Sequence, residues 1–509
     1  MIALYIFLGL LAILAVLLLI CLLRARLRKP TAALTAEPPE ADEARAEAYA
    51  RTLSQMVQIE TVSDRNDPDR SKFAAFQAAL PPLFPHIFDA CEISHPGDGL
   101  VVRYPGADGA GRPAILLMSH HDVVPADGAS WSHPPFSGDL DDGRIWGRGT
   151  VDTKGSLMCE LQALDELIAG GWRPENDVYI TSSCSEECSG DSCPQIVAWL
   201  KERGVRIGML MDEGGMILAA PISGVRGRYC MVGTVEKGYA DVRFTASGKG
   251  GHASAPAPGS PLPRLGAFMA EVDRKNPFRV ELSDTEQEMF RRFAPNMAGP
   301  MKLIFANLWL FAPLVRRLMP KVSHVAAAQM QTTCAFTMAQ GASAANVLPA
   351  EASVTANLRL IHHQPNEESF AVLDAIAKKY GLKREVLYQD PPRKPVDFRS
   401  WQFRFLESVA ADIYPGYDVV PYTMTGGTDA KFFDEISDCS LRFAPIEIDA
   451  AQYESIHGRD ENLYVRALVP AVDFYKEILK GYPEQSRKSE PGIDAKKIMY
   501  NKLCKLKRA

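Results

Sequence analysis

The sequence predicts an α/β fold, in which a mostly parallel sheet with flanking helices is joined by an inserted α+β domain and one N-terminal transmembrane helix. Three observations predict it: a long uncharged apolar run opens the chain, short apolar runs then alternate with helical patterns, and this alternation stops between residues 236 and 370. Alternating strands and helices are typical of parallel sheets covered by helices. The 509 residues exceed one ordinary domain, and 47% hydrophobic with 23% charged residues is the composition of a folded protein.

The net charge argues against one class of partner. With 56 basic and 62 acidic residues, the formal charge is −6, so no global attraction to nucleic acid is expected. The ten cysteines are scattered through a chain too large to need a disulfide framework, which suits a reducing compartment. Only Cys184, Cys188 and Cys193 cluster, and without a paired CxxC motif we interpret them as thiols rather than zinc ligands.

The first element is a transmembrane helix over residues 2–23. This run has no charged residue, and at about 1.5 Å per residue it spans roughly the 30 Å hydrocarbon core of a bilayer. A cleaved signal peptide is the alternative, but the basic n-region is missing and the apolar run is too long. Basic residues follow the run at Arg24, Arg26, Arg28 and Lys29. The positive-inside rule therefore predicts that the rest of the chain lies on the cytoplasmic side.

Residues 24–45 are predicted to be a linker, because 30–45 is rich in Pro, Ala and acids without apolar periodicity. The folded body is expected to begin near Ala46. At the other end, 483–509 is predicted to be a basic tail, since residues 496–509 carry lysines and an arginine but no acid. Such a tail suits an anionic inner leaflet, and equally a solvated terminus without lipid contact.

The body begins with alternating elements. Strands are predicted over 114–118, 178–181 and 207–211, with helices over 157–169 and 195–203. The carboxyl ends of parallel strands meet at one edge of a sheet, where binding sites form. We therefore expect the polar residues after each strand to lie together.

Histidines and carboxylates follow these strands in short motifs. The motifs are SHHDVVP (119–125), GRGTVDTKG (147–155), SEECSG (185–190), MDEGG (211–215) and SIHGRDENL (455–463). Adjacent carboxylates at Glu186 and Glu187 repel each other, and a cation is the simplest reason to keep them together. Histidines with carboxylates are the ligands of zinc, with manganese or cobalt as alternatives and magnesium disfavoured. Any one motif alone would indicate only a turn with solvated side chains.

Further motifs complete a recognisable series. They are GKGGHAS (248–254), NVLP (346–349), NLR (357–359) and GGTDA (426–430). In this order, the motifs resemble those of the M20 family of dinuclear zinc peptidases and amidohydrolases. The nearest branch contains carboxypeptidase S and the N-fatty-acyl-amino acid synthase/hydrolases, and the resemblance covers about residues 46–482.

The resemblance implies a fold of the dinuclear zinc exopeptidase type. Its catalytic domain would comprise 46–235 and 371–482. Residues 236–370 would form the inserted lid or dimerisation domain, and the protein would be a homodimer.

The resemblance also implies two Zn²⁺ per chain, with Co²⁺ or Mn²⁺ as possible substitutes. The implied metal ligands are His120, Asp152, Glu187, Asp212 and His457, with Asp152 bridging both ions. For one ligand the MDEGG motif offers both Asp212 and Glu213, and we take Asp212.

Other residues would act beside the metals. Asp122 would orient His120, Glu186 would be the general base, and His121 would be a bystander. In the inserted domain, His252 would contact the scissile carbonyl oxygen, often in the partner subunit; a turn with a solvent-facing histidine is the plainer interpretation.

Three residues are expected to bind a substrate carboxylate. Asn346 and Arg359 lie on neighbouring strand-like stretches, and guanidinium gives bidentate geometry to a carboxylate. Thr428 and the backbone amides of its glycine-rich turn would address the same end of the substrate; alone, that motif would be only a turn.

Residues 301–322 form an apolar, helix-like segment interrupted by Pro313. It is interpreted as lid core or dimer contact, or alternatively as an acyl-chain or membrane-facing surface, since Phe305, Trp309 and Leu310 make it apolar on more than one face.

Together these features predict a membrane-anchored dinuclear zinc hydrolase that cleaves amide bonds next to a free carboxylate, in small peptides or N-acyl amino acids. One alternative is a noncatalytic, membrane-tethered binding protein on the same fold. The other is an N-fatty-acyl amino acid synthase/hydrolase rather than a peptidase.

Overall fold

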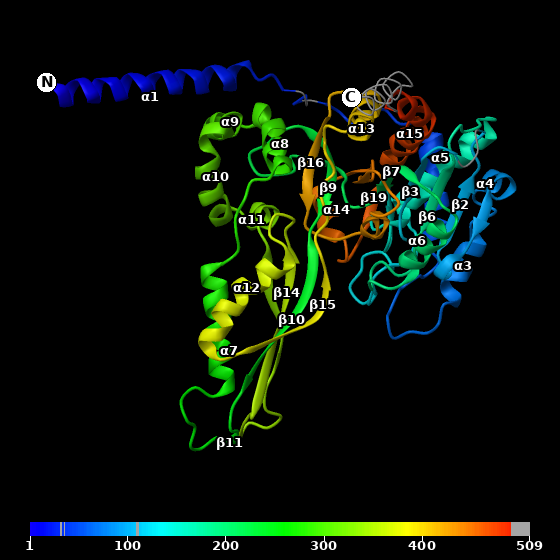
Figure 1. Cartoon of the computed structure of the whole chain (residues 1–509). Coiled ribbons are helices and arrows are strands. Elements are labelled where there is room, and N and C mark those ends of the chain that lie inside the picture. Colours follow the sequence, from blue (N-terminus) through cyan, green and yellow to red (C-terminus); the bar gives the residue numbers. More distant parts are fainter. Residues whose placement is uncertain (31–32, 35, 108–110, 490–509) are drawn as a thin grey trace, which may run out of the picture. The chain divides into compact units, whose positions relative to one another are not determined.

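The computed structural model describes residues 1–30, 33–34, 36–107 and 111–489 (Figure 1). The predicted basic stretch 496–509 lies outside them. The chain divides into two compact units. The larger unit comprises Pro30–Val232, Val396–Val420 and Thr428–Ala509. The smaller unit comprises Met1–Lys29, Gly233–Pro395 and Pro421–Gly427.

The larger unit is built on a mixed sheet. Ten strands of the described chain follow the order β1-β2-β6-β3-β7-β17-β9-β8-β18, with β16 also beside β9. Their bounds are β1 Glu92–Ser94, β2 Leu100–Tyr104, β3 Ala114–Met118, β6 Val178–Ser182, β7 Ile207–Asp212, β8 Ile217–Ala219, β9 Arg228–Glu236, β16 Asp418–Met424, β17 Ser440–Arg442 and β18 Glu447–Ile448. The central strands β6, β3, β7 and β17 are parallel. Because β1, β2 and β8 pair antiparallel, the sheet is mixed rather than mostly parallel.

Helices and a small second sheet surround these strands. The helices are α2 Glu43–Val57, α3 Ser71–Ala79, α4 Pro85–Ala90, α5 Lys154–Ala169, α6 Ser192–Glu202, α13 Trp401–Ile413, α14 Ala450–Ser455 and α15 Leu468–Ser489. The second sheet has the order β19-β5-β4, with bounds Asn462–Tyr464, Arg144–Trp146 and Leu140–Asp141. The helices predicted over 157–169 and 195–203 correspond to α5 and α6, and Leu157 and Leu164 of α5 are buried in the main core with Ile115 of β3.

The described cysteines are free thiols, as the sequence predicts. Cys184 accepts a hydrogen bond from Arg70 at 3.2 Å. Within the described chain, the clusters able to hold a metal ion contain no cysteine.

The smaller unit has its own sheet and core. Its four-stranded sheet has the order β12-β14-β10-β15, with bounds Thr333–Gln340, Glu351–Leu360, Gly238–Ser247 and Lys383–Asp390. A short ribbon pairs β11 (Gly251–His252) with β13 (Val347–Leu348). The helices are α7 Pro261–Lys275, α8 Asp284–Phe293, α9 Gly299–Ala306, α10 Leu308–Val322, α11 His324–Met330 and α12 Asn366–Ala377. Phe268 of α7 packs on Phe244 of β10 at 4.6 Å between ring centroids, so this helix covers the sheet.

The smaller unit also contains the N-terminal helix α1 (Ile2–Leu27). Its 26 residues are long and apolar enough to cross a membrane, and a signal sequence would have the same character. Among its residues only Cys21 and Ala25 are buried. The membrane anchor and its cytoplasmic orientation therefore stay predictions.

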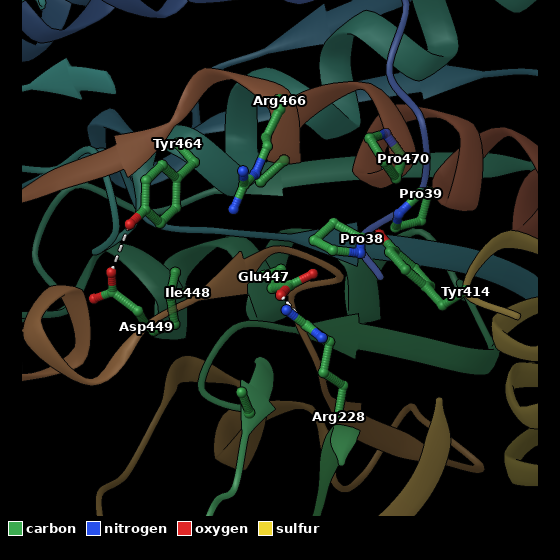
Figure 2. A pocket seen from close by; sticks show the side chains of 12 residues that line it. Pro38, Pro39, Arg228, Tyr414, Glu447, Ile448, Asp449, Tyr464, Arg466 and Pro470 are labelled. Carbon is green, nitrogen blue, oxygen red and sulfur yellow. Dashed lines mark hydrogen bonds and ion pairs between the residues drawn. The ribbon is translucent and has the colours of Figure 1, made fainter. Parts of the chain in front are cut away.

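Part of the predicted linker lies on the larger unit. The amide of Ala33 donates to the carbonyl of Gly416 at 2.7 Å, and the carbonyl of Ala36 accepts from Arg228. Pro38 and Pro39 line a pocket beside Arg228, which pairs with Glu447 at 2.7 Å (Figure 2). The end of the linker is thus fixed to the body.

Candidate metal centre

Three neighbouring parallel strands deliver the first set of functional side chains. The strands β6, β3 and β7 lie side by side in the sheet. His120 follows β3, Glu187 follows β6, and Glu213 follows β7. Their common carboxyl edge is where the sequence places the site.

Asp152 lies between two histidines. One carboxylate oxygen, Oδ1, is 2.9 Å from Nε2 of His120, and the other, Oδ2, is 3.0 Å from Nε2 of His457. A carboxylate that offers one oxygen to each of two imidazoles has the geometry of a bridging ligand.

Each histidine has a second carboxylate neighbour. Oε1 of Glu213 lies 3.4 Å from Nε2 of His120, and Oε2 of Glu187 lies 3.1 Å from Nε2 of His457. Two potential metal-binding clusters result, and Asp152 belongs to both of them.

The geometry favours Glu213 over Asp212 as the ligand from the MDEGG motif. The carboxylate of Asp212 accepts the backbone amides of Glu213 and Ala430, each at 2.8 Å. Asp212 therefore holds the turn after β7, while Glu213 points to His120. The choice of Asp212 as the ligand stays a prediction, because a carboxylate oxygen that accepts one backbone amide keeps a lone pair for a cation.

The donor set fits a pair of cations. Burial, with nearby Asp152, raises the pKa of Glu213 to about 8 in the absence of a metal, despite the opposing effect of His120. One oxygen of Glu187 is buried without a hydrogen-bond partner in the described chain. Buried carboxylates that repel each other and lack partners are stabilised by bound cations, and the imidazoles favour zinc.

Asp122 connects both halves of the site. Its carboxylate accepts the backbone amides of Glu186 and Glu187, each at 3.1 Å, and the hydroxyl of Ser63 at 2.6 Å. It also lies 3.4 Å from Nδ1 of His120. Burial would raise the pKa of Asp122, but these contacts, the His120 pairing first, lower it, so the carboxylate is charged. Asp122 thus orients His120 and the turn that carries the adjacent glutamates.

Glu186 has a different environment from Glu187. Within the described chain, its carboxylate makes no hydrogen bond, although its backbone amide is held by Asp122. Burial and the neighbouring acids Asp429 and Glu213 raise its pKa well above the usual value, against the opposing effect of His120. A carboxylate with a raised pKa beside a metal site is suited to accept and return a proton.

A buried ion pair, which the sequence reasoning missed, supports the segment around Asp152. One oxygen of Glu461 lies 2.6 Å from Arg148, and the other accepts the backbone amides of Gly149, Val151 and Asp152 at 3.1, 2.8 and 3.1 Å. A side chain at Gly155 would meet the carbonyl of Thr150 at 2.2 Å, so the turn requires glycine. Arg148 and Glu461 lie in two of the recognised motifs, and their opposite charges are the signal that could have paired them.

His121 lies apart from the metal clusters. It stacks on Phe76 at 5.0 Å between ring centroids, and its Nδ1 is 2.8 Å from the hydroxyl of Ser182. Burial lowers its pKa to about 3, so the ring is neutral and part of the core. Thr428 is also buried, at 1% exposure, and its hydroxyl accepts the amide of Ala430 at 3.3 Å. His121 is thus part of the core, and the substrate-binding role of Thr428 stays a prediction.

In the smaller unit, two predicted residues are neighbours. The amide of Ala253, next to His252, donates to the carbonyl of Asn346 at 3.0 Å, and both His252 and Asn346 are exposed. Nδ1 of His252 accepts the amide of Ser254 at 3.1 Å. In the neutral ring, Nε2 therefore carries the proton and can donate it to an oxyanion.

Arg359 lies away from this pair. The strand β14 is extended from Glu351 to Arg359, which separates the two ends by roughly 26 Å at about 3.3 Å per residue. Asn346 precedes this strand, so Asn346 and Arg359 of one chain cannot bind the same carboxylate as we predicted. The guanidinium of Arg359 lies over the ring of Tyr239 at 4.8 Å and makes no ion pair within the described chain. It is available to an anionic ligand.

Comparison with known proteins identifies the family. Residues 116–481 match the peptidase family M20/M25/M40. The chain belongs to this family. The N-fatty-acyl-amino acid synthase/hydrolase PM20D1 of Xenopus tropicalis is 31% identical over 435 residues, which cover 84% of each chain. The probable carboxypeptidase S-like 2 of Dictyostelium discoideum is 29% identical over 445 residues, 85% of this chain and 84% of that protein.

A solved structure shares the fold of this M20 family member. The M20 family metallo-carboxypeptidase Sso-CP2 of Sulfolobus solfataricus superposes with a TM-score of 0.63 at 18% identity, over 86% of this chain and 99% of that chain. The family and the branch predicted from the motifs are thus confirmed, and the chain is an enzyme of the metallopeptidase and amidohydrolase type. The alternative of a noncatalytic binding protein is not supported.

Proposed function

We propose that this M20 enzyme is a membrane-anchored dinuclear zinc hydrolase that cleaves an amide bond next to a free carboxylate. Its substrates would be small peptides, cut at the C-terminal residue, or N-acyl amino acids. The observation that supports it best is Asp152, whose two oxygens lie 2.9 and 3.0 Å from two different histidines. The names of the similar proteins, an N-fatty-acyl-amino acid synthase/hydrolase and a probable carboxypeptidase, support this proposal, because both describe action on an amide bond next to a free carboxylate.

Two ligand sets would hold the metals. His120 and Glu213 would bind one ion, Glu187 and His457 the other, and Asp152 would bridge them. Bound zinc supplies Lewis-acid polarisation of the substrate carbonyl and lowers the pKa of water at the site toward neutrality.

The residues of the chain would then move the protons. Glu186 precedes Glu187 of one ligand set in the sequence and lies close to His120 and Glu213 of the other. Its carboxylate would accept the proton of the attacking water and transfer it to the leaving nitrogen. Asp122 would keep Glu186 in position through the backbone amide that it binds. Because Glu186 is the only one of these residues proposed to act purely as a base, its loss should leave the metals bound.

Recognition of the substrate would involve the smaller unit. Nε2–H of His252 would donate to the carbonyl oxygen, with Asn346 beside it, and Arg359 would bind the substrate carboxylate. Within one chain, the extended strand β14 keeps Asn346 and Arg359 apart. We therefore propose that His252 and Asn346 act together on the substrate of a partner subunit in a homodimer. Thr428 and the backbone amides of its glycine-rich turn would address the same carboxylate end of the substrate, and the Thr428 hydroxyl also holds the turn by accepting the amide of Ala430.

The anchor would be α1, with the remainder of the chain on the cytoplasmic side. Its uncharged length and the basic residues at its end support this orientation. Protease added outside intact cells should leave the body uncut, and cleavage there would contradict the orientation without affecting the proposed chemistry.

A substrate panel tests the proposed activity. The purified full-length enzyme is incubated with dipeptides and with N-acyl amino acids of increasing chain length, with and without a chelator. We expect hydrolysis that the chelator abolishes and that added zinc restores. Hydrolysis of neither panel would reject the proposal, and the chain-length profile would distinguish a carboxypeptidase from a fatty-acyl amidohydrolase.

A further inference from the structure

The smaller unit exposes an unusual apolar strip on α10. Leu310, Leu314, Leu318 and Val322 recur at four-residue intervals, which places them along one side of a helix. Leu314, Leu318 and Val322 are 43, 45 and 74% exposed, and Trp309 at the start of the helix is 52% exposed. We call Trp309, Leu310, Leu314, Leu318 and Val322 the α10 strip. A contiguous exposed strip of large apolar residues marks a surface that binds something.

The α10 strip begins beside the last turns of α1. The side-chain amide of Asn307 donates to the carbonyl of Cys21 at 3.0 Å, and the guanidinium of Arg24 lies 5.9 Å from the ring of Trp309. Figure 1 draws α9 next to the same end of α1. Basic residues follow Leu23 there, as at the headgroup level of a membrane span, and tryptophan is enriched at this level. The start of α10 is therefore placed at the membrane interface if α1 spans the bilayer.

The charges around α10 suit an anionic leaflet. Between Glu288 and Glu351 the sequence has no acidic residue, while Lys302, Arg316, Arg317 and Lys321 are basic. Basic side chains beside an apolar strip are the pattern of a helix that lies in the interface plane.

The bent pair of α9 and α10 is also apolar enough to be considered as a broken span, with an angle of 116° between its halves. Two observations argue against spanning. Leu308 and Val315 are buried in the smaller unit, so one side of α10 is occupied by protein. Arg316 and Arg317 lie mid-helix, and charged side chains at the bilayer centre are strongly disfavoured.

We propose that the α10 strip docks onto the bilayer surface beside α1, as an interfacial helix that fixes the smaller unit against the leaflet. The ligand is the lipid bilayer itself, recognised by apolar insertion and by attraction to anionic headgroups. The inference goes beyond the proposed hydrolysis and rests only on α1 as the anchor.

Trp309 makes a native reporter for this contact. The chain has six tryptophans, and by position Trp309 is the only one of them in the smaller unit. The full-length protein is reconstituted into vesicles of phosphatidylcholine and phosphatidylserine, with or without brominated acyl chains, and tryptophan emission is compared. We expect bromolipid quenching in the wild type and loss of most of it in Trp309→Phe. Equal quenching in both proteins, or none in the wild type, would overturn the proposal.

Trp309 could be quenched only because it lies beside α1, so a second reporter must show that the whole α10 strip contacts the lipid. In Trp309→Phe/Leu318→Trp the reporter lies nine residues further along α10, about 13 Å away at roughly 1.5 Å per residue. We expect bromolipid to quench it as well, and an unquenched reporter there would overturn docking. Leu314→Asp should reduce quenching of Trp309 while flotation with the vesicles, which depends on α1, is unchanged. Leu387→Asp, at a 42% exposed position of β15, is the matched control and should behave as the wild type.

Other occupants of the strip predict a different result. A second copy of the chain, or a substrate acyl chain, would shield Trp309 from lipid, so bromination would not change the wild-type emission. Hydrolysis of a short, water-soluble substrate should be normal in Leu314→Asp, so failure of docking and failure of the proposed activity are distinguishable.

Discussion

The buried ion pair between Arg148 and Glu461 gives the sharpest quantitative prediction. The two side chains are 3 and 0% exposed and lie 2.6 Å apart. Glu461→Gln keeps the shape and an oxygen for the amides of Gly149, Val151 and Asp152, but it removes the charge that compensates Arg148. Breaking a buried pair by removing one partner costs about 3 to 5 kcal/mol, because the remaining charge is uncompensated. We expect the free energy of unfolding to fall by that amount.

The same substitution should weaken metal binding. The amide of Asp152 is one of the three that Glu461 holds, so its loss should displace the bridging carboxylate. Residues that orient metal ligands typically change affinity by about 10-fold to 100-fold. We therefore expect zinc affinity to fall by that factor, measured by competition with a chromophoric chelator.

Urea unfolding followed by tryptophan fluorescence measures the stability of the larger unit in Glu461→Gln. Every tryptophan except Trp309 lies in the residue ranges of that unit. Asp438→Asn is the matched control, because Asp438 and Arg206 form a pair at 2.9 Å that is 47 and 69% exposed. An exposed pair contributes about 0 to 1 kcal/mol. If Glu461→Gln is as stable as Asp438→Asn and binds zinc normally, the role assigned to Glu461 is wrong.

Four further predictions concern the metal centre. Glu186→Gln should keep both metals but lower turnover by about 100-fold to 10,000-fold; equal activity would remove its role as base. Because a base must be ionised, kcat/KM of the wild type should fall as pH decreases through the pKa of Glu186 in the metal-loaded enzyme, and the residual rate of Glu186→Gln should lack this dependence. Glu213→Gln should reduce metal content measured by mass spectrometry, whereas Asp212→Asn should mainly destabilise the turn after β7; the reverse result would restore Asp212 as the ligand. Chelation should lower the melting temperature of the wild type, because buried carboxylates such as Glu187 lose the positive charge of the bound metals. An unchanged melting temperature would contradict the proposal that two metal ions bind at this site.

The sequence predicted the part of the site that depends on strand order. His120 and Glu187 were predicted because residues that follow neighbouring parallel strands must meet at one edge. Adjacent residues on a strand point to opposite sides, so the residues of the MDEGG motif offered both Asp212 and Glu213, and the choice of Asp212 rested on the family resemblance. The sequence did not indicate that the carboxylate of Asp212 accepts the amide of Ala430, which lies more than two hundred residues away.

Longer-range geometry was harder to predict. The spacing between Asn346 and Arg359 suggested a pair, yet the extended strand between them keeps them apart. The pairing of Arg148 with Glu461 was missed because each residue alone looks like part of a polar turn. The sequence did not indicate that the sheet is mixed, because antiparallel strands such as β1 and β8 have only three residues each and show no distinct pattern.

The hydrogen bonds of Asp122 have a consequence for how enzymes of this kind lose activity. A single carboxylate supports a histidine of one ligand set and the backbone of Glu186 and Glu187. A substitution at Asp122 would therefore damage the placement of the base and the binding of metal at the same time. Among the residues at this edge of the sheet, Glu186 is the one whose substitution should stop hydrolysis while the ions stay bound. A related protein that stores or senses metal could therefore arise from a change at Glu186, but not from a change at Asp122.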